Sequence, residues 1–455
     1  MKVVLLFIIG LLMHAANAFR PVDGATSDAA ATALAGGFLL LAGYLAGAIF
    51  KRLGLPKLTG YLAAGIVAGP QVLALVSHEQ VEHLQIFNGI AVALIGLSAG
   101  VEMNFRALAS MLRSILWISL IAVFGTALLL SGAVALLRDS LPFFDGLSDV
   151  QVVAIAGVLG LAMAAKSPAV VVALRDETDA EGPTVRTALA VVVLSDIAII
   201  LLFALASSLA RATFGHSADA LETAASLSWN VLGSGAVGVV IGALIALYLR
   251  YLKGGALFIA AVAFLVAEVG RRIQLDPLLV ALAAGMFIRN ATSRSARLYG
   301  ELDAASFPVY IAFFAVTGAG VHLDALIHLW VPVTIIVALR AFGFYFGTRI
   351  AAGIAKAPDA VRRYAGFGLM PQAGLALALA ILFQRSFPDL GHEAAALVFG
   401  IVALNEMLAP VAFRIALLRS GEAGQLKRGD AVDLDGSQLP EPPVEPPAEG
   451  TPEAG

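Results

Sequence analysis

Long, uninterrupted runs of apolar residues constrain this chain more than any other feature. A transmembrane α-helix needs about 20 apolar residues, and a run that is apolar all round indicates lipid as its surroundings. The chain is 60% hydrophobic and only 13% charged, which leaves too little charge to coat a water-soluble domain of 455 residues. The sequence therefore predicts an all-α membrane protein with about thirteen transmembrane helices. The segments lie near 31–50, 59–76, 84–101, 115–137, 151–174, 187–209, 229–249, 255–270, 276–289, 304–320, 330–349, 363–384 and 394–413.

Composition also removes several functional classes. The chain has no cysteine, which excludes disulfides, thiolate catalysis and cysteine-bound metals. A net charge of -3 gives no support for nucleic-acid binding. Because the sequence has no HExxH motif, no GxSG serine motif and no paired intramembrane aspartates, an intramembrane enzyme is disfavoured. We expect no cofactor and no tightly bound metal.

The first 18 residues are typical of a signal peptide. Lys2 supplies a positive start, residues 3–13 form an apolar core, and Ala16-Asn17-Ala18 resembles a cleavage site. The alternative is a first membrane helix, but so short a core reaches across only part of a bilayer interior of ~30 Å. We predict that 1–18 is removed and that the transmembrane domain covers 19–417.

Loop charges predict the orientation. If the mature N-terminus lies outside, inward segments hold twenty lysines and arginines and outward segments hold six. Basic residues concentrate on the cytoplasmic side of membrane proteins, so this bias supports the frame. The Arg271-Arg272 pair is the outward feature that fits poorly. The sequence thus predicts a multi-pass protein of the bacterial inner membrane, with a periplasmic N-terminus and a cytoplasmic C-terminus.

The last segment, 418–455, differs from the rest of the chain. It is mostly polar, has no aromatic residue and ends in PEPPVEPPAEGTPEAG. Such a sequence cannot bury enough apolar surface to fold, so we expect a disordered cytoplasmic tail.

Five charged residues fall inside apolar segments: Lys166, Asp196, Glu268, Arg340 and Glu406. A charge at mid-membrane costs ~2.5–3.5 kcal/mol, so each needs a partner, a wet cavity or a function. A structural ion pair between helices is the plain alternative for any one of them, and Glu268 lies close enough to its segment end to reach the interface. Asp196 lies deep in its segment, which favours a functional role.

Two segments contain a proline break. Pro168 lies within AAKSPA and Pro371 within LMPQAG, where Gly374 follows. Proline lacks the backbone donor and frees the carbonyl four residues earlier, here those of Ala164 and Phe367. In lipid such carbonyls must be satisfied by protein, water or an ion. An ordinary kink would explain either proline alone.

The two broken segments, 151–174 and 363–384, are the fifth and the twelfth. They are an odd number of segments apart, so they run through the membrane in opposite directions. We predict two inverted six-helix repeats on either side of a linker helix at 229–249, with crossed discontinuous helices at the centre. Matching interruptions in two such repeats indicate a transport site at the midplane. Asp196 in that site can hold either a proton or a desolvated cation, and this competition is enough to couple the two fluxes.

Seven motifs then resemble, in order, the bacterial monovalent cation–proton antiporters of the sodium/hydrogen exchanger type. They cover nearly all of the membrane part. The motifs are LTGYLAAGIVAGP (58–70), LIGLSAGVEMNFRAL (94–108), the stretch 162–205, PVYIAFFAVTGAGVHLDAL (308–326), RAFGFYFGTR (340–349), MPQAGLALAL (370–379) and ALNEMLAP (403–410).

The resemblance implies a homodimer in the lipid bilayer that exchanges Na⁺ or K⁺ for H⁺. A core of helices at 115–209 and 330–413 would move against a scaffold at 31–101 and 255–320. By resemblance, Asp196 with Ser195 binds the ion, Ser167 lies at the crossing, Arg340 faces the aspartate, and Glu406 matches a family position.

Two departures from the family leave an alternative open. Ser195-Asp196 supplies one acid where electrogenic relatives carry two, which favours one-for-one exchange. Lys166 stands where relatives usually carry threonine or another small residue. Its ammonium can pair with Asp196, and with Arg340 it leaves the centre at a charge of +1 unless Glu406 lies within reach. The alternative is an antiporter fold with a locked or altered site, acting as a sensor, a subunit or a carrier of an anionic solute.

Overall fold

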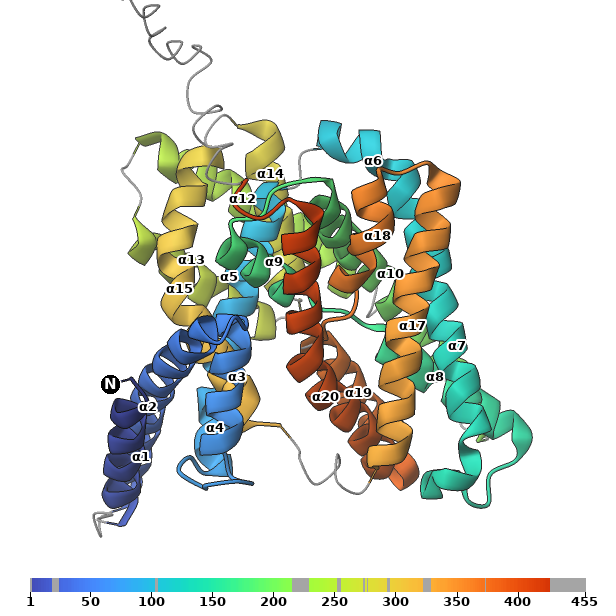
Figure 1. Cartoon of the computed structure of the whole chain (residues 1–455), viewed down its shortest axis with the longest axis horizontal. Coiled ribbons are helices and arrows are strands. Elements are labelled where there is room, and N and C mark those ends of the chain that lie inside the picture. The colour runs from blue at the N-terminus through green and yellow to red at the C-terminus, as the bar shows by residue number, and fades with distance from the viewer. Residues whose placement is uncertain are drawn as a thin grey trace, which may run out of the picture.

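The computed structural model describes residues 2–18, 24–102, 105–214, 229–251, 255–272, 275, 277–292, 295–321, 329–372 and 374–425. Throughout these ranges the secondary structure is helical, with no strand (Figure 1). The helices of the first half are α1 (Lys2–Ala18), α2 (Gly24–Arg52), α3 (Lys57–Ala68), α4 (His78–Leu84), α5 (Ile86–Glu102), α6 (Phe105–Ile118), α7 (Gly125–Leu136), α8 (Asp149–Ala164), α9 (Pro168–Thr178) and α10 (Pro183–Thr213). Those of the second half are α12 (Ser234–Tyr251), α13 (Ala256–Arg272), α14 (Pro277–Ala291), α15 (Ser295–Ala319), α17 (Trp330–Ala355), α18 (Asp359–Gly368), α19 (Gly374–Ser386) and α20 (Pro388–Ser420).

Every predicted apolar segment contains a helix in the structure, which confirms the all-α membrane fold. Among the described residues, 8 helical spans are long and apolar enough to cross a membrane by themselves. Others, such as α3 and α14, are apolar but shorter. The number of crossings therefore stays a prediction. The predicted tail lies outside the described residues from 426 onward.

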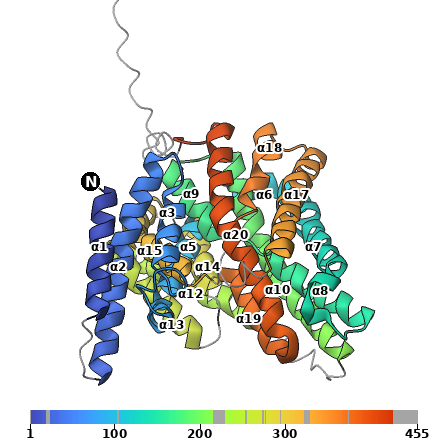
Figure 2. The same cartoon turned by 60° about the horizontal axis from the view of Figure 1, so that its bottom comes forward.

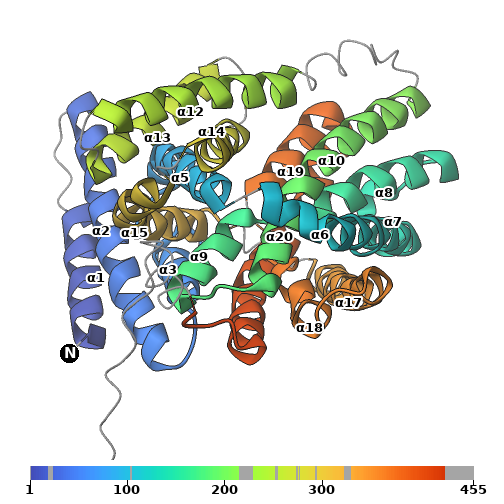
Figure 3. The ribbon, with the colours of Figure 1, turned by 90° about the horizontal axis from the view of Figure 1, so that it is seen from above.

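Seen from above, the helices form two groups (Figure 3). One group holds α1–α3, α5 and α12–α15, and the other holds α6–α8, α10 and α17–α19. Helices α9 and α20 lie along the boundary, where α9 contacts α3 and α5, and α20 contacts α3. Few helices therefore form the boundary between the two groups.

Glycines bring helices of the first group into close contact. A Cβ on Gly65 of α3 would lie 1.9 Å from the carbonyl oxygen of Ala315 in α15. A Cβ on Gly318 of α15 would lie 2.2 Å from the carbonyl oxygen of Leu62. Small residues let membrane helices approach until their backbones touch, and here they fix α3 against α15.

The N-terminal helix α1 lies along α2 at one edge of the molecule (Figures 1 and 2). Met13 is buried, and Asn17 Nδ2 donates to the backbone oxygen of Leu75 at 2.8 Å. These contacts belong to the chain before any cleavage. Removal of residues 1–18 stays a prediction.

Two helix pairs are interrupted as the prolines predict. Helix α8 begins at a capping box, in which Ser148 accepts from the backbone N–H of Gln151 and the Gln151 side chain accepts in return. It ends at Ala164, and α9 starts with Ser167 as its cap and Pro168 in its first turn. Likewise α18 ends at Gly368 and α19 begins at Gly374. In Figure 1 the pair α8–α9 runs upward and the pair α18–α19 runs downward, so the two broken segments are antiparallel, as predicted.

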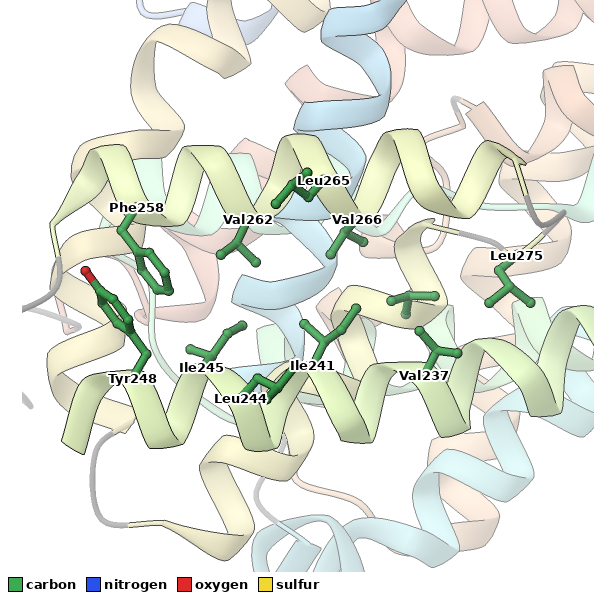
Figure 4. A pocket seen from close by; sticks show the side chains of 11 residues that line it. Val237, Ile241, Leu244, Ile245, Tyr248, Phe258, Val262, Leu265, Val266 and Leu275 are labelled. Atoms are coloured by element: carbon green, nitrogen blue, oxygen red, sulfur yellow. The ribbon is translucent and has the colours of Figure 1, made fainter. Parts of the chain in front are cut away.

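An apolar groove separates α12 from α13 (Figure 4). Branched aliphatic side chains line its length, and the rings of Tyr248 and Phe258 stack at one end with centroids 3.7 Å apart. No charged side chain is among its lining residues, so the groove is not suited to bind an ion.

Candidate functional site

The two broken helices meet at their interruptions. The backbone N–H of Ser167, between α8 and α9, donates to the carbonyl oxygen of Pro371, between α18 and α19, at 3.0 Å. The carbonyl of Met163 accepts from Gln372 Nε2 at 2.9 Å. Backbone groups that the breaks remove from helical pairing are thus paired across the crossing, as burial requires.

Arg340 of α17 joins both breaks and is fully buried. Its Nε donates to the carbonyl of Met163 at 2.8 Å and its Nη2 to that of Ala165 at 2.9 Å, while Nη1 donates to the carbonyl of Met370. The guanidinium carbon lies 4.7 Å from the ring centroid of Phe344, within reach of a cation–π contact. A planar fork of donors suits three converging carbonyls, so Arg340 holds the crossing together.

Lys166 and Asp196 form an ion pair beside this crossing. Lys166 Nζ lies 2.9 Å from Asp196 Oδ1, and the two side chains are 0% and 7% exposed. Lys166 Nζ also donates to the carbonyl of Ala164 at 3.3 Å, which is the carbonyl that Pro168 frees. The Lys166 ammonium therefore pairs with the carbonyl that the helix break leaves free, and it also neutralises the Asp196 carboxylate on α10.

Comparisons of the sequence and of the structure with known proteins agree with one another. Residues 36–419 match the family described as the transmembrane sodium/hydrogen exchanger. This chain belongs to the sodium/hydrogen exchanger family. Its members are transporters rather than enzymes, and the membership supports exchange of a cation for protons across a membrane.

Solved structures show the same fold. The structure of the sodium proton antiporter MjNhaP1 from Methanocaldococcus jannaschii at pH 8 is similar with a TM-score of 0.61, at 16% sequence identity. The match covers 86% of this chain and 99% of that one. An electron-microscopy map of the same antiporter gives a TM-score of 0.63 at 16% identity, covering 89% and 98% of the two chains.

The two serines of this exchanger-family site point to backbone groups of their own segments. Ser167 Oγ accepts from the backbone N–H of Val170 at 3.4 Å and so caps α9. Ser195 Oγ donates to the carbonyl of Val191, one turn earlier in α10. The carboxylate of Asp196, in contrast, is held by its ion pair with Lys166, and neither oxygen accepts a hydrogen bond from any other residue in the described part of the chain.

Two uncharged residues, Gln372 and Asn405, complete the hydrogen bonds at the crossing. Gln372 accepts at Oε1 from Asn405 Nδ2 at 2.7 Å, while its own amide donates to the α8 carbonyl described above. Asn405 therefore ties α20 to the crossing. Both residues lie in motifs that carry the family resemblance, MPQAGLALAL and ALNEMLAP. A neutral side chain in a membrane segment does not by itself indicate a functional site in the sequence.

Glu406 does not join the charged pair. It is buried, and neither of its carboxylate oxygens has a hydrogen-bond partner among the described residues. Glu406 instead lines a small cavity with Leu58 and Leu62 of α3, Val170 of α9, Phe314 of α15 and Pro410 of α20. Glu268 on α13 is partly exposed, in keeping with a position near the end of its segment.

Proposed function

We propose that this chain exchanges a monovalent cation, Na⁺ or K⁺, for H⁺ across the bacterial inner membrane, with Asp196 as the carboxylate that binds them in turn. The observation that supports this most is a buried carboxylate beside the crossing of two broken helices, held by an ion pair with the ammonium of Lys166. Such a carboxylate must be neutralised by a proton, a metal ion or a fixed cation before it moves through lipid.

Lys166 acts, in this proposal, as a built-in competitor of the transported cation. When no metal ion is bound, its ammonium occupies the place beside Asp196 Oδ1. An arriving cation would displace it, and the carbonyl of Ala164 would keep one hydrogen bond to the withdrawn ammonium. A proton on Asp196 would also break the ion pair. Both transported species thus act on the same contact.

The two helix groups would supply the movement. In this proposal the group with α6–α8, α10 and α17–α19, together with α9 and α20, acts as the core. Helices α2, α3, α5 and α13–α15 of the other group act as the scaffold, with α12 as the linker. We propose that the core carries Asp196 past a scaffold that also forms the homodimer contact. The single acid in Ser195-Asp196 favours one cation for one proton.

The closed ion pair also favours a second candidate function. If Lys166 never leaves Asp196, the protein keeps the exchanger fold without cation exchange, and acts as a sensor, a subunit or a carrier of an anionic solute. A buried ion pair of 2.9 Å is costly to break, so the observation counts for this alternative as well.

The two candidates separate in proteoliposomes that hold a pH gradient. Adding Li⁺, Na⁺, K⁺ or Rb⁺ separately to the wild type should dissipate the gradient for at least one ion if the first candidate is right. Lys166→Thr removes the competitor, so the first candidate predicts a lower half-saturating cation concentration. The locked-site candidate wins if the wild type is inactive with all four ions and Lys166→Thr creates exchange.

A further inference from the structure

Glu406 is a buried carboxyl group that takes no part in the ion pair of Lys166 and Asp196. It lies on α20 directly after Asn405, which faces the crossing through Gln372. Successive residues on a helix point about 100° apart, so Glu406 faces a different neighbour. That neighbour is the scaffold, because the cavity that Glu406 lines is closed by Leu58 and Leu62 of α3 and by Phe314 of α15.

The chemistry of this cavity selects its ligand. Apart from Glu406, its lining residues are apolar: Leu58, Leu62, Val170, Phe314 and Pro410. Monovalent metal ions need several oxygen ligands, and this lining offers one carboxyl group and room for about one water molecule. A proton needs only the carboxyl group itself. The site therefore suits H⁺ and not Na⁺ or K⁺.

Charged groups on the surrounding helices are engaged elsewhere. Lys166 pairs with Asp196, and Arg340 donates to three carbonyls. Glu177 of α9 accepts from the backbone N–H of Lys57 at the start of α3. No charged side chain lines the cavity with Glu406, so an ionised form would lack compensation in the described structure.

We propose that Glu406 is a second proton-binding site, and that it must hold its proton for the core to move past the scaffold. The neutral acid can slide over the leucines of α3 and the ring of Phe314, whereas the bare carboxylate would carry an uncompensated charge across an apolar surface. Protons would then act twice: as transported ions at Asp196 and as a condition for movement at Glu406. This inference rests on the proposed function, because it needs a moving core.

Equal-pH exchange of radioactive sodium or rubidium between the two sides of proteoliposomes isolates the movement from the proton gradient. As pH rises, Glu406 loses its proton, and the wild-type exchange should decline at alkaline pH. Glu406→Gln has no proton to lose, so it should keep exchange and lose the alkaline decline. Glu406→Leu, which suits the apolar lining, should do the same and guards against a folding defect of one variant. Glu393→Gln, an exposed carboxyl on the same helix, should keep the wild-type profile.

Two outcomes overturn the proposal. One is an unchanged pH profile in both Glu406 variants, and the other is loss of exchange at every pH in variants that are folded. If the wild type moves neither ion, the proposed function has failed, and infrared spectroscopy of the purified protein decides on Glu406 alone. A protonated carboxyl band that titrates with pH and is absent from Glu406→Gln supports the site, and identical spectra refute it.

Discussion

At the level of single residues, Arg340 gives the clearest case of a charge whose task is structural. Its donors reach carbonyls of Met163, Ala165 and Met370, which belong to both broken helices. Of these three carbonyls, that of Met163 also accepts from Gln372 Nε2. Arg340 thereby supports the site without touching the carboxylate of Asp196 in any hydrogen bond found in the described structure.

Replacing the guanidinium of Arg340 should lower the stability of the protein more than it changes the affinity for the ion. In Arg340→Lys a single ammonium cannot reach three carbonyls, and hydrogen bonds to charged groups contribute ~1.5–3 kcal/mol each. We expect the free energy of unfolding to fall by about 3 kcal/mol, which is measured as a lower melting temperature in detergent. Arg349→Lys, an exposed change on the same helix, is the control and should melt like the wild type. Equal melting of both variants would contradict the structural role of Arg340.

The sequence predicts the charged residues of the site better than their partners. Asp196 and Lys166 stand out because charges inside lipid are rare, and the structure places them 2.9 Å apart. The roles of Ser195 and Ser167 come from resemblance, and in the structure both hydroxyls pair with backbone groups. Which carbonyls a long arginine reaches depends on helix packing and not on spacing along the chain.

At the level of helices, a carboxylate links the two groups across their boundary. Glu177 at the end of α9 accepts from the backbone N–H of Lys57 with both oxygens, at 2.8 and 2.9 Å. It therefore supplies an acceptor and a negative charge at the start of α3, where the helix dipole favours one. If the core moves against the scaffold, this contact must break in every cycle.

Weakening the contact between Glu177 and the start of α3 should make the transport cycle faster. Glu177→Gln leaves one acceptor oxygen and removes the negative charge, whose interaction with a helix N-terminus contributes ~0.3–1 kcal/mol. We expect a higher maximal exchange rate in proteoliposomes with an unchanged half-saturating cation concentration. Glu181→Gln is the matched control, because Glu181 pairs with Arg175 and Arg186 inside one group. A rate for Glu177→Gln no different from that of the control would mean that this contact does not restrain the movement.

Helix interruptions are predictable because their physical cause is local. A proline removes a donor wherever it stands, so Pro168 and Pro371 mark both breaks in the sequence. The contact of Glu177 with α3 is not predictable in this way, since it joins residues 120 positions apart. Its signal in the sequence is only an acidic residue near the end of a helix, which most helices tolerate.

At the level of the whole molecule, the two helix groups meet over a narrow boundary formed mainly by α3, α5, α9 and α20. Alternating sides of a membrane by movement of one group requires such a boundary to slide. The assignment of these groups to a moving core and a fixed scaffold stays a proposal, and α12, the predicted linker, packs on α14. The sequence alone contains the segments but not their grouping, which depends on contacts between distant helices.

A covalent link across the boundary should stop exchange. The chain has no cysteine of its own, so paired cysteines can be placed without a background. We expect that Leu62→Cys with Val170→Cys, two residues of the same cavity, loses exchange on treatment with a short thiol cross-linker. The control pair, Ile241→Cys with Val262→Cys, lies in the apolar groove between α12 and α13 and should keep exchange when cross-linked. Full activity of a cross-linked Leu62/Val170 pair would rule out sliding at this boundary.

The proposed exchange depends on the carboxylate of Asp196, and its most direct test is the cation-driven proton flux of Asp196→Asn. The variant should be compared in proteoliposomes with the wild type and with Asp389→Asn, a change at the start of α20. We predict that Asp196→Asn lowers the flux to the level of empty liposomes while Asp389→Asn retains it. A flux in Asp196→Asn with the wild-type rate and cation dependence would show that the ion binds elsewhere.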